Sequence, residues 1–366
     1  MNQISNNSAL QPLEKLRPIE LPPLPNQPLV SILMANYNYG RYIGEALHSA
    51  LRQTYPHFEV IVCDDGSTDD SREVVSRYCE RDPRIRLLTK ENGGLASALN
   101  CAFAASQGEI VCLLDADDIF LPEKLEHVVK AFLRCHDCGL CIHRVLKIDE
   151  HARPFSYARP AILLSGWLAQ EALLKGTHVR SLPPASGLSF RRPVLDLLFP
   201  VSTRLRRVVD AYISHTAQLI TKLCAVPEAL SNQRIHASNI TSGRTFHTSM
   251  VSRLIEDTRL LNILQREFLA QHYGAPVAQL LGLENHSHYW SFLLLSHILS
   301  GSRSQMIGGE PAALALTHLH DKKQRLLARI LLALPRRFAL MAIDLWTGQS
   351  AGTAVLANTF RSLLRI

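Results

Sequence analysis

Short apolar runs alternate with amphipathic stretches over roughly the first 150 residues of the chain. Apolar runs of about four to eight residues predict buried strands, and apolar residues at helical spacing predict the helices that cover them. This alternation predicts an α/β fold whose mixed, mostly parallel sheet carries helices on both faces. The predicted strands are Leu29–Met34, Phe58–Cys63, Arg84–Leu88, Glu109–Leu114 and Leu140–Ile148. One predicted helix has an apolar face formed by Ile43, Ala46, Leu47, Ala50 and Leu51, and a second is capped by Ser67 or Thr68. Two more are predicted at Leu95–Ser106 and from Pro122 to about Arg134.

The chain divides into three parts by pattern. Residues 1–28 carry six of the 19 prolines and predict a flexible tail. An α/β domain is expected over residues 29–244, ending with a strand at Ser186–Phe190 and a helical stretch from Val208 to Leu223. Residues 245–366 predict a helical region for acceptor, membrane-surface or oligomer contacts, interrupted at Gly274–Pro276.

Carboxylates follow two of the predicted strands directly. Asp64 and Asp65 come after one strand, and Asp115, Asp117 and Asp118 come after another. Because the carboxyl ends of parallel strands meet at one edge of a sheet, both groups should converge on one cleft. Crowded carboxylates are tolerated where a cation neutralises them, and Mg²⁺ or Mn²⁺ takes one or two carboxylates plus phosphate oxygens. The pattern predicts a metal–diphosphate site; the alternative is an acidic turn that caps the helix beginning near Pro122.

Other nucleotide-binding patterns are missing from the sequence. Gly40 and Gly44 after the first strand do not form Gly-x-Gly-x-x-Gly, and no Gly-rich loop with Gly-Lys-Ser/Thr occurs. Dinucleotide-dependent enzymes and phosphate-loop NTPases are therefore disfavoured.

Composition adds modest limits. The 366 residues carry a net charge of +7, which suits an anionic substrate or membrane surface, and no nucleic-acid motif accompanies it. Cys63, Cys101 and Cys112 lie in apolar runs and are expected to be small buried residues in a reducing compartment. No signal-peptide pattern or apolar run of spanning length is present, so a cytoplasmic location is expected.

The run VSILMANYNYGRYIGEALHSALRQTYPHFEVIVCDDGSTDDS, followed by KENGGLASALNCAFAASQGEIVCLLDADD, resembles the family 2 glycosyltransferases of the GT-A fold. The resemblance covers roughly Pro28 to Ile240. It implies a Rossmann-related catalytic domain and an inverting enzyme that moves a sugar from a nucleoside diphosphate, with a UDP-sugar favoured, to an acceptor hydroxyl. The implied cofactor is Mn²⁺ or Mg²⁺.

The resemblance also assigns residues. Ala35, where the family often has Pro, would line the nucleotide pocket with Asn36 and Tyr37. Asp64 and Asp65 would contact base or ribose, and Asp115 and Asp117 would form the Asp-x-Asp metal motif. The complete nucleotide-sugar set is Ala35, Asn36, Tyr37, Asp64, Asp65, Asn92, Asp115 and Arg234, and the metal set is Asp115, Asp117 and His236.

Asp210 is the predicted general base. An inverting transfer needs a carboxylate that takes the acceptor proton, and the family often has Glu-Asp where this chain has Val209-Asp210. The alternative is a surface helix residue. Arg234 and His236 belong to a segment that resembles the family's late Arg-x-His-x-x-Asn, where Arg can pair with phosphate and His can ligate the metal.

Two other functions stay open beside sugar transfer. One is a catalytically silent sugar-nucleotide binder or scaffold, and the other is a hydrolase that uses the same metal site. The sugar and the acceptor are also open, with a saccharide, a lipid-linked oligosaccharide or a protein as acceptor. The basic amphipathic pattern from Asp321 to Trp346 fits either a bundle packed on the catalytic domain, which we favour, or peripheral contact with the inner face of a membrane.

The spacing Cys135-x-x-Cys138-x-x-Cys141, with His136 and His143 nearby, matches metal-ligand spacing. Cys141 and His143 fall in a strand pattern, whereas Cys135 ends a helix, and no second Cys pair closes a site. We therefore favour a structural role without metal.

Overall fold

The structure is a computed structural model. It describes residues 13–14, 16–175, 182–236, 239, 248–283, 287–300, 306–307, 310–311 and 322–333. The chain forms two compact units, each considered by itself below. The first comprises residues 1–148, 157–170 and 179–234, and the second comprises 149–156, 171–178 and 235–366.

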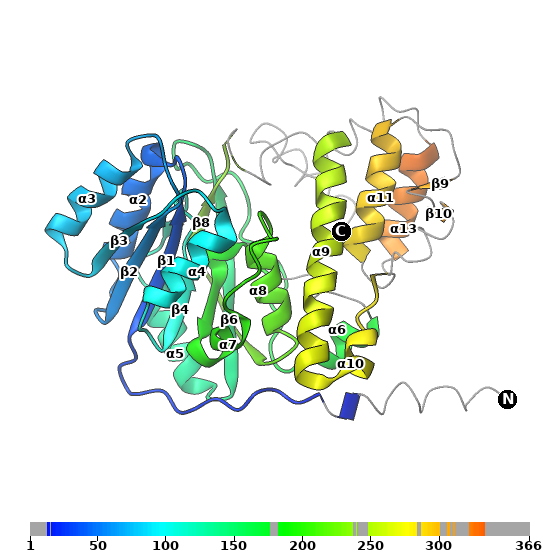
Figure 1. Cartoon of the computed structure of the whole chain (residues 1–366), viewed down its shortest axis with the longest axis horizontal. Coiled ribbons are helices and arrows are strands. Elements are labelled where there is room, and N and C mark those ends of the chain that lie inside the picture. Colours follow the sequence, from blue (N-terminus) through cyan, green and yellow to red (C-terminus); the bar gives the residue numbers. More distant parts are fainter. Residues whose placement is uncertain are drawn as a thin grey trace. The chain divides into compact units, whose positions relative to one another are not determined.

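An eight-stranded mixed sheet forms the centre of the first unit, in the order β3-β2-β1-β4-β7-β6-β8-β5 (Figure 1). The strands are β1 (Val30–Asn36), β2 (Phe58–Asp64), β3 (Ile85–Thr89), β4 (Ile110–Leu113), β5 (Ile119–Phe120), β6 (Cys138–Ile148), β7 (Leu188–Arg191) and β8 (Lys222–Arg234). The predicted α/β class and the five predicted strands are confirmed.

The strand directions decide which residues meet at each edge of the sheet. β1 pairs in parallel with both β2 and β4, with Asn36 opposite Asp64 and Leu33 opposite Leu113. β7 is antiparallel to β4 and β6, and β6 is parallel to β8. β4, β6 and β8 therefore run in one direction, so the ends of β2, β4 and β8 lie at the same edge as the start of β7. We call this edge the carboxyl edge.

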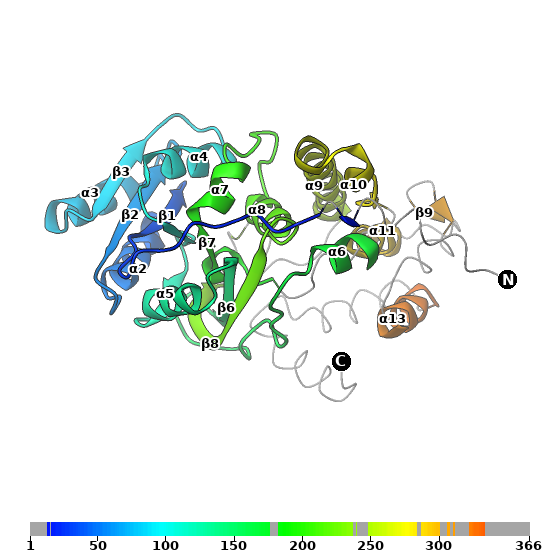
Figure 2. The same ribbon diagram turned by 90° about the horizontal axis from the view of Figure 1, so that it is seen from below.

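Helices cover both faces of this sheet, and Figure 2 shows α4 and α7 on the face opposite α2 and α5. One face carries a buried apolar cluster to which β1, α2, α3 and α5 contribute, with Ile32, Leu47, Val75 and Phe132 among its members. The helices are α2 (Gly40–Leu51), α3 (Ser71–Arg81), α4 (Leu95–Ala105), α5 (Lys124–Arg134), α7 (Arg192–Leu198) and α8 (Val209–Ala217), with a 3₁₀ turn at Ala185–Gly187.

Two local expectations were wrong. The helix expected to start at Ser67 or Thr68 begins at Ser71, because the Ser67 hydroxyl accepts a hydrogen bond from the Asn38 N–H (2.9 Å) instead of capping a helix. The helical stretch expected to reach Leu223 ends at Ala217, and β8 follows from Lys222. Pro227 and the register shifts between β6 and β8 break the apolar alternation that would have revealed this strand.

Part of the stretch predicted to be a flexible tail lies against the first unit. The Ile19 N–H donates to the Ile220 carbonyl (2.8 Å), and the Tyr55 hydroxyl donates to the Pro28 carbonyl (2.7 Å). The buried Arg191 guanidinium donates to the Pro22 carbonyl. These bonds hold residues 19–28 along the edge opposite the carboxyl edge.

The second unit is mainly helical, as expected for the last third of the chain. Its described elements are α9 (Thr248–Tyr273), α10 (Ala275–Gln279), α11 (Ser287–Ser300), α13 (Lys322–Ala333) and the two-stranded pair β9 (Met306–Ile307) and β10 (Glu310–Pro311), while α6 (Ala169–Lys175) bridges the division between units. The basic stretch predicted from Asp321 contains α13, and its continuation to Trp346 lies outside the described residues.

Apolar side chains from α9 and α11 form the core of this unit, with Val251, Ile255, Trp290 and Leu294 buried. The Arg259 guanidinium donates to the Tyr289 hydroxyl (2.7 Å) and connects the same two helices. Within the described part of the chain, every helix is too short or too polar to cross a lipid bilayer. The predicted domain boundary at residue 244 also falls outside the described residues.

Truncation of Leu47 should destabilise the first unit strongly. Leu47 is fully buried on α2, and Leu47→Ala should lower the free energy of unfolding by about 2–5 kcal/mol, because a cavity replaces apolar contacts. The matched control is Leu197→Ala on α7, whose side chain is 39% exposed and should lose less than about 1 kcal/mol. Urea denaturation followed by circular dichroism measures both, and equal losses would contradict this packing.

Candidate active site

The loop after β1 and the loop after β2 are joined by side-chain hydrogen bonds. The Asn36 amide donates to Asp64 Oδ2 (2.7 Å) and to the Ser67 hydroxyl (3.1 Å). Asn38 Oδ1 accepts from the Thr68 N–H (2.8 Å), and Asn38 takes the left-handed backbone conformation that Asn tolerates (φ 59°). Two loops from neighbouring strands thus behave as one wall at the carboxyl edge.

Asp64 is the centre of that wall. Its Oδ1 accepts from the Ser67 N–H (2.9 Å) and from Arg72 Nε (2.7 Å), and the residue is almost fully buried. Burial alone would raise the pKa of Asp64, but the hydrogen bonds from Ser67, Arg72 and Asn36 outweigh it and lower the pKa below its ordinary value. Asp64 is therefore held as a carboxylate.

Asp65 links the wall to the turn before α4. Its two oxygens accept from the Gly93 N–H (3.0 Å) and the Gly94 N–H (2.7 Å), next to the positive end of the α4 dipole. Lys90 Nζ forms an ion pair with the same carboxylate at 2.7 Å. Both predicted acidic residues after β2 thus already have protein donors.

Asn92 lies in the same turn, against Gly66. Gly66 has a φ of 82°, and a Cβ built on it would lie 2.9 Å from the Asn92 backbone nitrogen, so only glycine fits this approach. An open depression of about 410 Å³ lies here, lined by Gly66, Arg72, Thr89, Lys90, Glu91 and Asn92.

The predicted residues at the end of β1 differ in exposure. Ala35 is partly buried and the Tyr37 side chain is 46% exposed. Asn36 is buried, and among the described residues its Oδ1 has no hydrogen-bond donor. Because a buried acceptor without a donor is costly, this oxygen is suited to a donor from a ligand.

Asp115, Asp117 and Asp118 form the acidic turn that follows β4 at the carboxyl edge. Burial raises the pKa of Asp115 well above its ordinary value, and the charges of Asp117 and Asp210 raise it further. Burial, Asp117 and Asp115 do the same to the pKa of Asp118. Burial also raises the pKa of the Tyr39 phenol in the loop after β1, and the charges of the acidic turn raise it further. The surroundings of the turn thus disfavour the ionised forms of Asp115 and Asp118.

Arg234, at the end of β8, lies behind this turn. Its backbone N–H donates to Asp118 Oδ1 (2.9 Å), and its Nε donates to the Asp117 carbonyl (2.9 Å). Its guanidinium is buried, stacks 5.1 Å from the Tyr42 ring centroid and forms an ion pair with Glu45. These contacts hold the turn; the predicted contact with a nucleotide sugar stays a prediction.

Asp210 lies in the first turn of α8, and the preceding Val208 has a left-handed backbone conformation (φ 50°). This conformation is rare for a β-branched residue and occurs at functional sites. Burial raises the pKa of Asp210, and Asp210 lies near enough to Asp115 to raise the pKa of that carboxyl. The structure therefore brings together the predicted base and one predicted metal ligand.

His236 belongs to the second unit, so its predicted role at the metal stays a prediction. Its backbone N–H donates to Asn239 Oδ1 (2.6 Å), and the amide of Asn239 lies 3.3 Å from His236 Nε2. Among the described residues, the acidic turn does not gather three Asp, Glu, His or Cys ligand atoms within 4.8 Å of one another.

Sequence reasoning missed Ser67, Arg72 and Lys90, which bind the two acidic residues after β2. Ser67 lies inside the quoted Asp-Asp-Gly-Ser motif, so its spacing from Asp64 could have indicated a turn that bonds back to the carboxylate. Arg72 and Lys90 carry no such local signal, because α3 and β3 bring them to the site.

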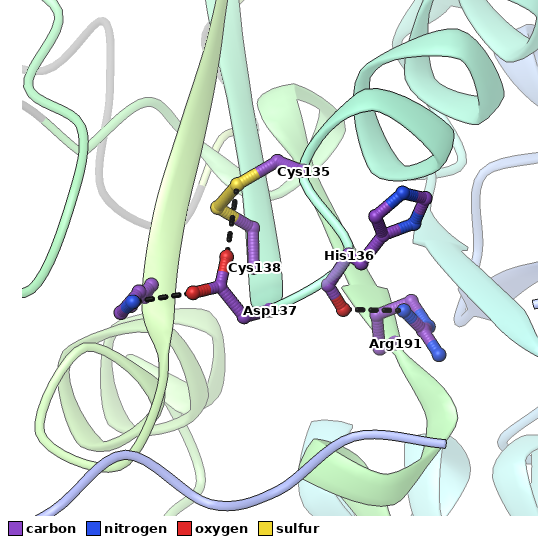
Figure 3. The surroundings of a disulfide bond; sticks show 6 residues. Cys135, His136, Asp137, Cys138 and Arg191 are labelled. Carbon is purple, nitrogen blue, oxygen red and sulfur yellow. Dashed lines mark hydrogen bonds and ion pairs between the residues drawn. A yellow bond between two sulfur atoms is a disulfide. The ribbon is translucent and has the colours of Figure 1, made fainter. Parts of the chain in front are cut away.

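The Cys-x-x-Cys-x-x-Cys segment does not form a three-thiolate site. Cys135 and Cys138 are joined by a disulfide between the end of α5 and the start of β6, while Cys141 is a buried free thiol opposite Cys224 on β8. Figure 3 shows the Asp137 carboxylate beside the disulfide and the His136 ring directed away from it.

This disulfide lies at the edge opposite the acidic turn, because β6 begins there. Of the cysteines expected to be buried, Cys63 and Cys112 are buried free thiols, whereas Cys101 is partly exposed. That last expectation was wrong, although the Cys101 thiol lies beside the buried Cys63 thiol of β2.

Sequence comparison identifies relatives of this chain. The profile of Glycosyl transferase family 2 matches residues 31–194. An uncharacterised glycosyltransferase of Nostoc sp. strain PCC 7120 is 36% identical over 253 residues, which cover 68% of this chain and 78% of that protein. The chain belongs to glycosyltransferase family 2.

Other relatives match over a shorter segment. The hyaluronan synthase of Pasteurella multocida is 42% identical over 120 residues, or 33% of this chain and 12% of the synthase. A mannosyltransferase from Pyrobaculum calidifontis, solved with GDP-mannose and Mn²⁺, has a TM-score of 0.50 at 19% identity over 93% of this chain and 94% of that chain. This likeness shows the shared GT-A fold.

Asp64 and Asp115 should affect stability with opposite sign. The pKa of Asp64 is lowered by folding, so its carboxylate stabilises the protein above the ordinary pKa of about 3.9, and this contribution disappears as pH falls through the lowered value. Asp64→Asn should therefore cost about 1–3 kcal/mol at pH 7 and less near pH 3. The pKa of Asp115 is raised, so Asp115→Asn should stabilise the metal-free protein at pH 7 and have little effect at low pH.

Thermal unfolding in the presence of a chelator, across this pH range, measures both effects. Asp196→Asn serves as control, since this α7 side chain is 54% exposed and should change the melting temperature little. A loss of stability in Asp115→Asn at neutral pH would contradict the repulsion assigned to the acidic turn.

Proposed function

We propose that the protein is a metal-dependent inverting glycosyltransferase that moves a sugar from a nucleoside-diphosphate sugar, with a UDP-sugar favoured, to an acceptor hydroxyl. The observation that carries this proposal is the convergence of Asp115 and Asp210 at the carboxyl edge, where the Asn36–Asp64 wall also lies. Family membership makes it a glycosyltransferase; the donor, metal and stereochemistry are the proposed parts.

Mn²⁺ or Mg²⁺ fits the donor set of the acidic turn. Asp115 and Asp117 offer oxygen ligands. Burial and then the charges of Asp117 and Asp210 raise the pKa of Asp115, and a bound cation would stabilise its ionised form. One or two carboxylates suffice where diphosphate oxygens and water complete the coordination. When bound, the cation supplies Lewis-acid stabilisation of the diphosphate leaving group. His236 is a further candidate ligand.

The Asn36–Asp64 wall and the Asn92 turn would bind the nucleoside. Asn36 Oδ1, which accepts no hydrogen bond from the described residues, would accept one from a ribose or base donor. The exposed Tyr37 ring offers a surface on which a base can stack. Because Asp64 and Asp65 are already occupied by protein donors, we propose that they act mainly by holding these loops in place.

Asp210 would act as general base. Burial raises its pKa, which makes the carboxylate a stronger proton acceptor. The acceptor hydroxyl would give its proton to Asp210 as its oxygen attacks the anomeric carbon from the face opposite the diphosphate. The names of the Pasteurella relatives, hyaluronan synthase and chondroitin synthase, support a saccharide acceptor.

Donor binding tests the proposal directly. We expect one of UDP, GDP and dTDP to bind the purified protein in a Mn²⁺-dependent manner, with UDP favoured, because the diphosphate and the acidic turn both need the cation. Isothermal titration calorimetry with and without Mn²⁺ measures this binding. Asp115→Ala should weaken it at least about tenfold, and Asp196→Ala, at an exposed position on α7, should leave it unchanged. Folded protein that binds none of the three would favour a silent scaffold.

Asp210→Asn should separate chemistry from donor binding. The amide cannot accept the proton, so transfer should fall by about 10²-fold or more while Mn²⁺-dependent nucleotide binding stays within about twofold of wild type. A coupled assay of diphosphate release, with an oligosaccharide acceptor mixture, measures transfer. Normal turnover would remove the assigned role of Asp210, and equally fast sugar release without acceptor would indicate a hydrolase.

A further inference from the structure

Ser186 lies at the carboxyl edge without belonging to any recognised motif of the chain. It is fully buried in the 3₁₀ turn Ala185–Gly187, immediately before β7. Because β7 is antiparallel to β4, the start of β7 lies beside the end of β4, where the acidic turn begins. Topology thus places a buried hydroxyl directly against the acidic turn.

The Ser186 side chain contacts two members of that turn. Its hydroxyl donates to Asp118 Oδ2 (2.6 Å), and its oxygen accepts from the Asp115 backbone N–H (3.3 Å). The other Asp118 oxygen is bound by the Arg234 backbone. Asp118 is therefore held on both sides, from β7 and from β8, and its carboxylate is turned inward.

The backbone of Ser186 is itself fixed by buried donors. Its carbonyl accepts from Lys124 Nζ (2.7 Å) and from the Ser231 hydroxyl (2.6 Å). Lys124 is fully buried, lies 3.5 Å from the Phe120 ring centroid, and burial lowers the pKa of its ammonium to about 8. Burying the Lys124 ammonium and the Ser231 hydroxyl costs free energy unless both are hydrogen-bonded. Their bonds to the Ser186 carbonyl therefore fix the position of Ser186.

We propose that Ser186, supported by Lys124, is a positioning residue that preorganises the acidic turn for the divalent cation. The inference rests on the proposed metal site. Three adjacent carboxylates repel one another, and this repulsion would open the turn if nothing held Asp118 and the Asp115 backbone. Ser186 holds the Asp118 carboxylate and the Asp115 backbone, so that Asp115 and Asp117 are the carboxylates that would bind the cation. Asp118 instead bonds to protein groups.

If Ser186 positions the metal ligands, its loss should weaken Mn²⁺ binding but leave nucleotide affinity at saturating Mn²⁺ nearly unchanged. Loss of a residue that orients metal ligands typically weakens metal binding about 10–100-fold. Ser186→Ala should therefore raise the apparent Kd for Mn²⁺ at least about tenfold. At saturating Mn²⁺, nucleotide affinity should return to within about twofold of wild type, because the nucleoside wall does not involve Ser186.

The matched control is Ser189→Ala. Ser189 is also fully buried on the same strand, β7, but its hydroxyl contacts the Cys112 thiol (3.2 Å) instead of the acidic turn. This variant should bind Mn²⁺ within about twofold of wild type. Lys124→Met, which keeps the length of the side chain and removes the donor, should weaken Mn²⁺ binding in the same direction as Ser186→Ala.

The experiment titrates full-length protein with Mn²⁺, following the paramagnetic resonance signal of the free ion, alone and with the nucleoside diphosphate that wild type binds. Circular dichroism verifies folding, and Ser186→Cys, a weaker donor of similar shape, replaces the alanine variant if that fails to fold. Mn²⁺ affinity in the serine variant equal to wild type, or an equal loss in Ser189→Ala, would overturn the positioning role alone. Wild type that binds neither Mn²⁺ nor nucleotide would overturn the proposed function and this inference together.

Discussion

Electrostatic repulsion among carboxylates at the carboxyl edge is the constraint on which the rest of the first unit depends. β2 and β4 both run toward this edge beside β1, so Asp64, Asp65 and the acidic turn all lie there. Negative charge in a partly buried place must be met by hydrogen-bond donors, by cations, or by a ligand. The loops at this edge are arranged to meet some of the charge with protein groups.

The two acidic groups meet this constraint in different ways. Asp64 and Asp65 accept hydrogen bonds from Arg72, Lys90 and the turn before α4, and these bonds fix the loops that carry them. In the acidic turn, Ser186 and the Arg234 backbone both donate hydrogen bonds to the Asp118 carboxylate. The pKa of Asp115 nevertheless stays raised, mainly because of burial. The first group therefore stabilises the loops, and the second contains carboxyl groups whose ionised forms a cation would stabilise.

Asp210 and the Asn36–Asp64 wall lie at the same edge as the acidic turn. The left-handed Val208 backbone leads into α8 where Asp210 approaches Asp115. Asn36, whose Oδ1 accepts no hydrogen bond from the described residues, lies at the end of β1. The proposed base, metal site and donor pocket lie on one edge, as an inverting transfer would require. The parts come from strands and helices whose order in the sheet differs from their order in the chain.

The sequence by itself determined the α/β class, the five early strands and the carboxylates that follow two of them, because strand patterns and parallel crossovers are local properties. It also determined family membership through Asp-x-Asp and its neighbouring motifs. Only the tertiary structure decided that β7 is inserted antiparallel between β4 and β6, and that β8 lies beside β5. Those pairings bring Ser186 and Arg234 into hydrogen-bond contact with Asp118. Ser186 is 68 residues from Asp118 in the chain, and Arg234 is 116 residues from it. Contacts over such separations depend on how strands pair across the sheet, and no local pattern encodes that pairing.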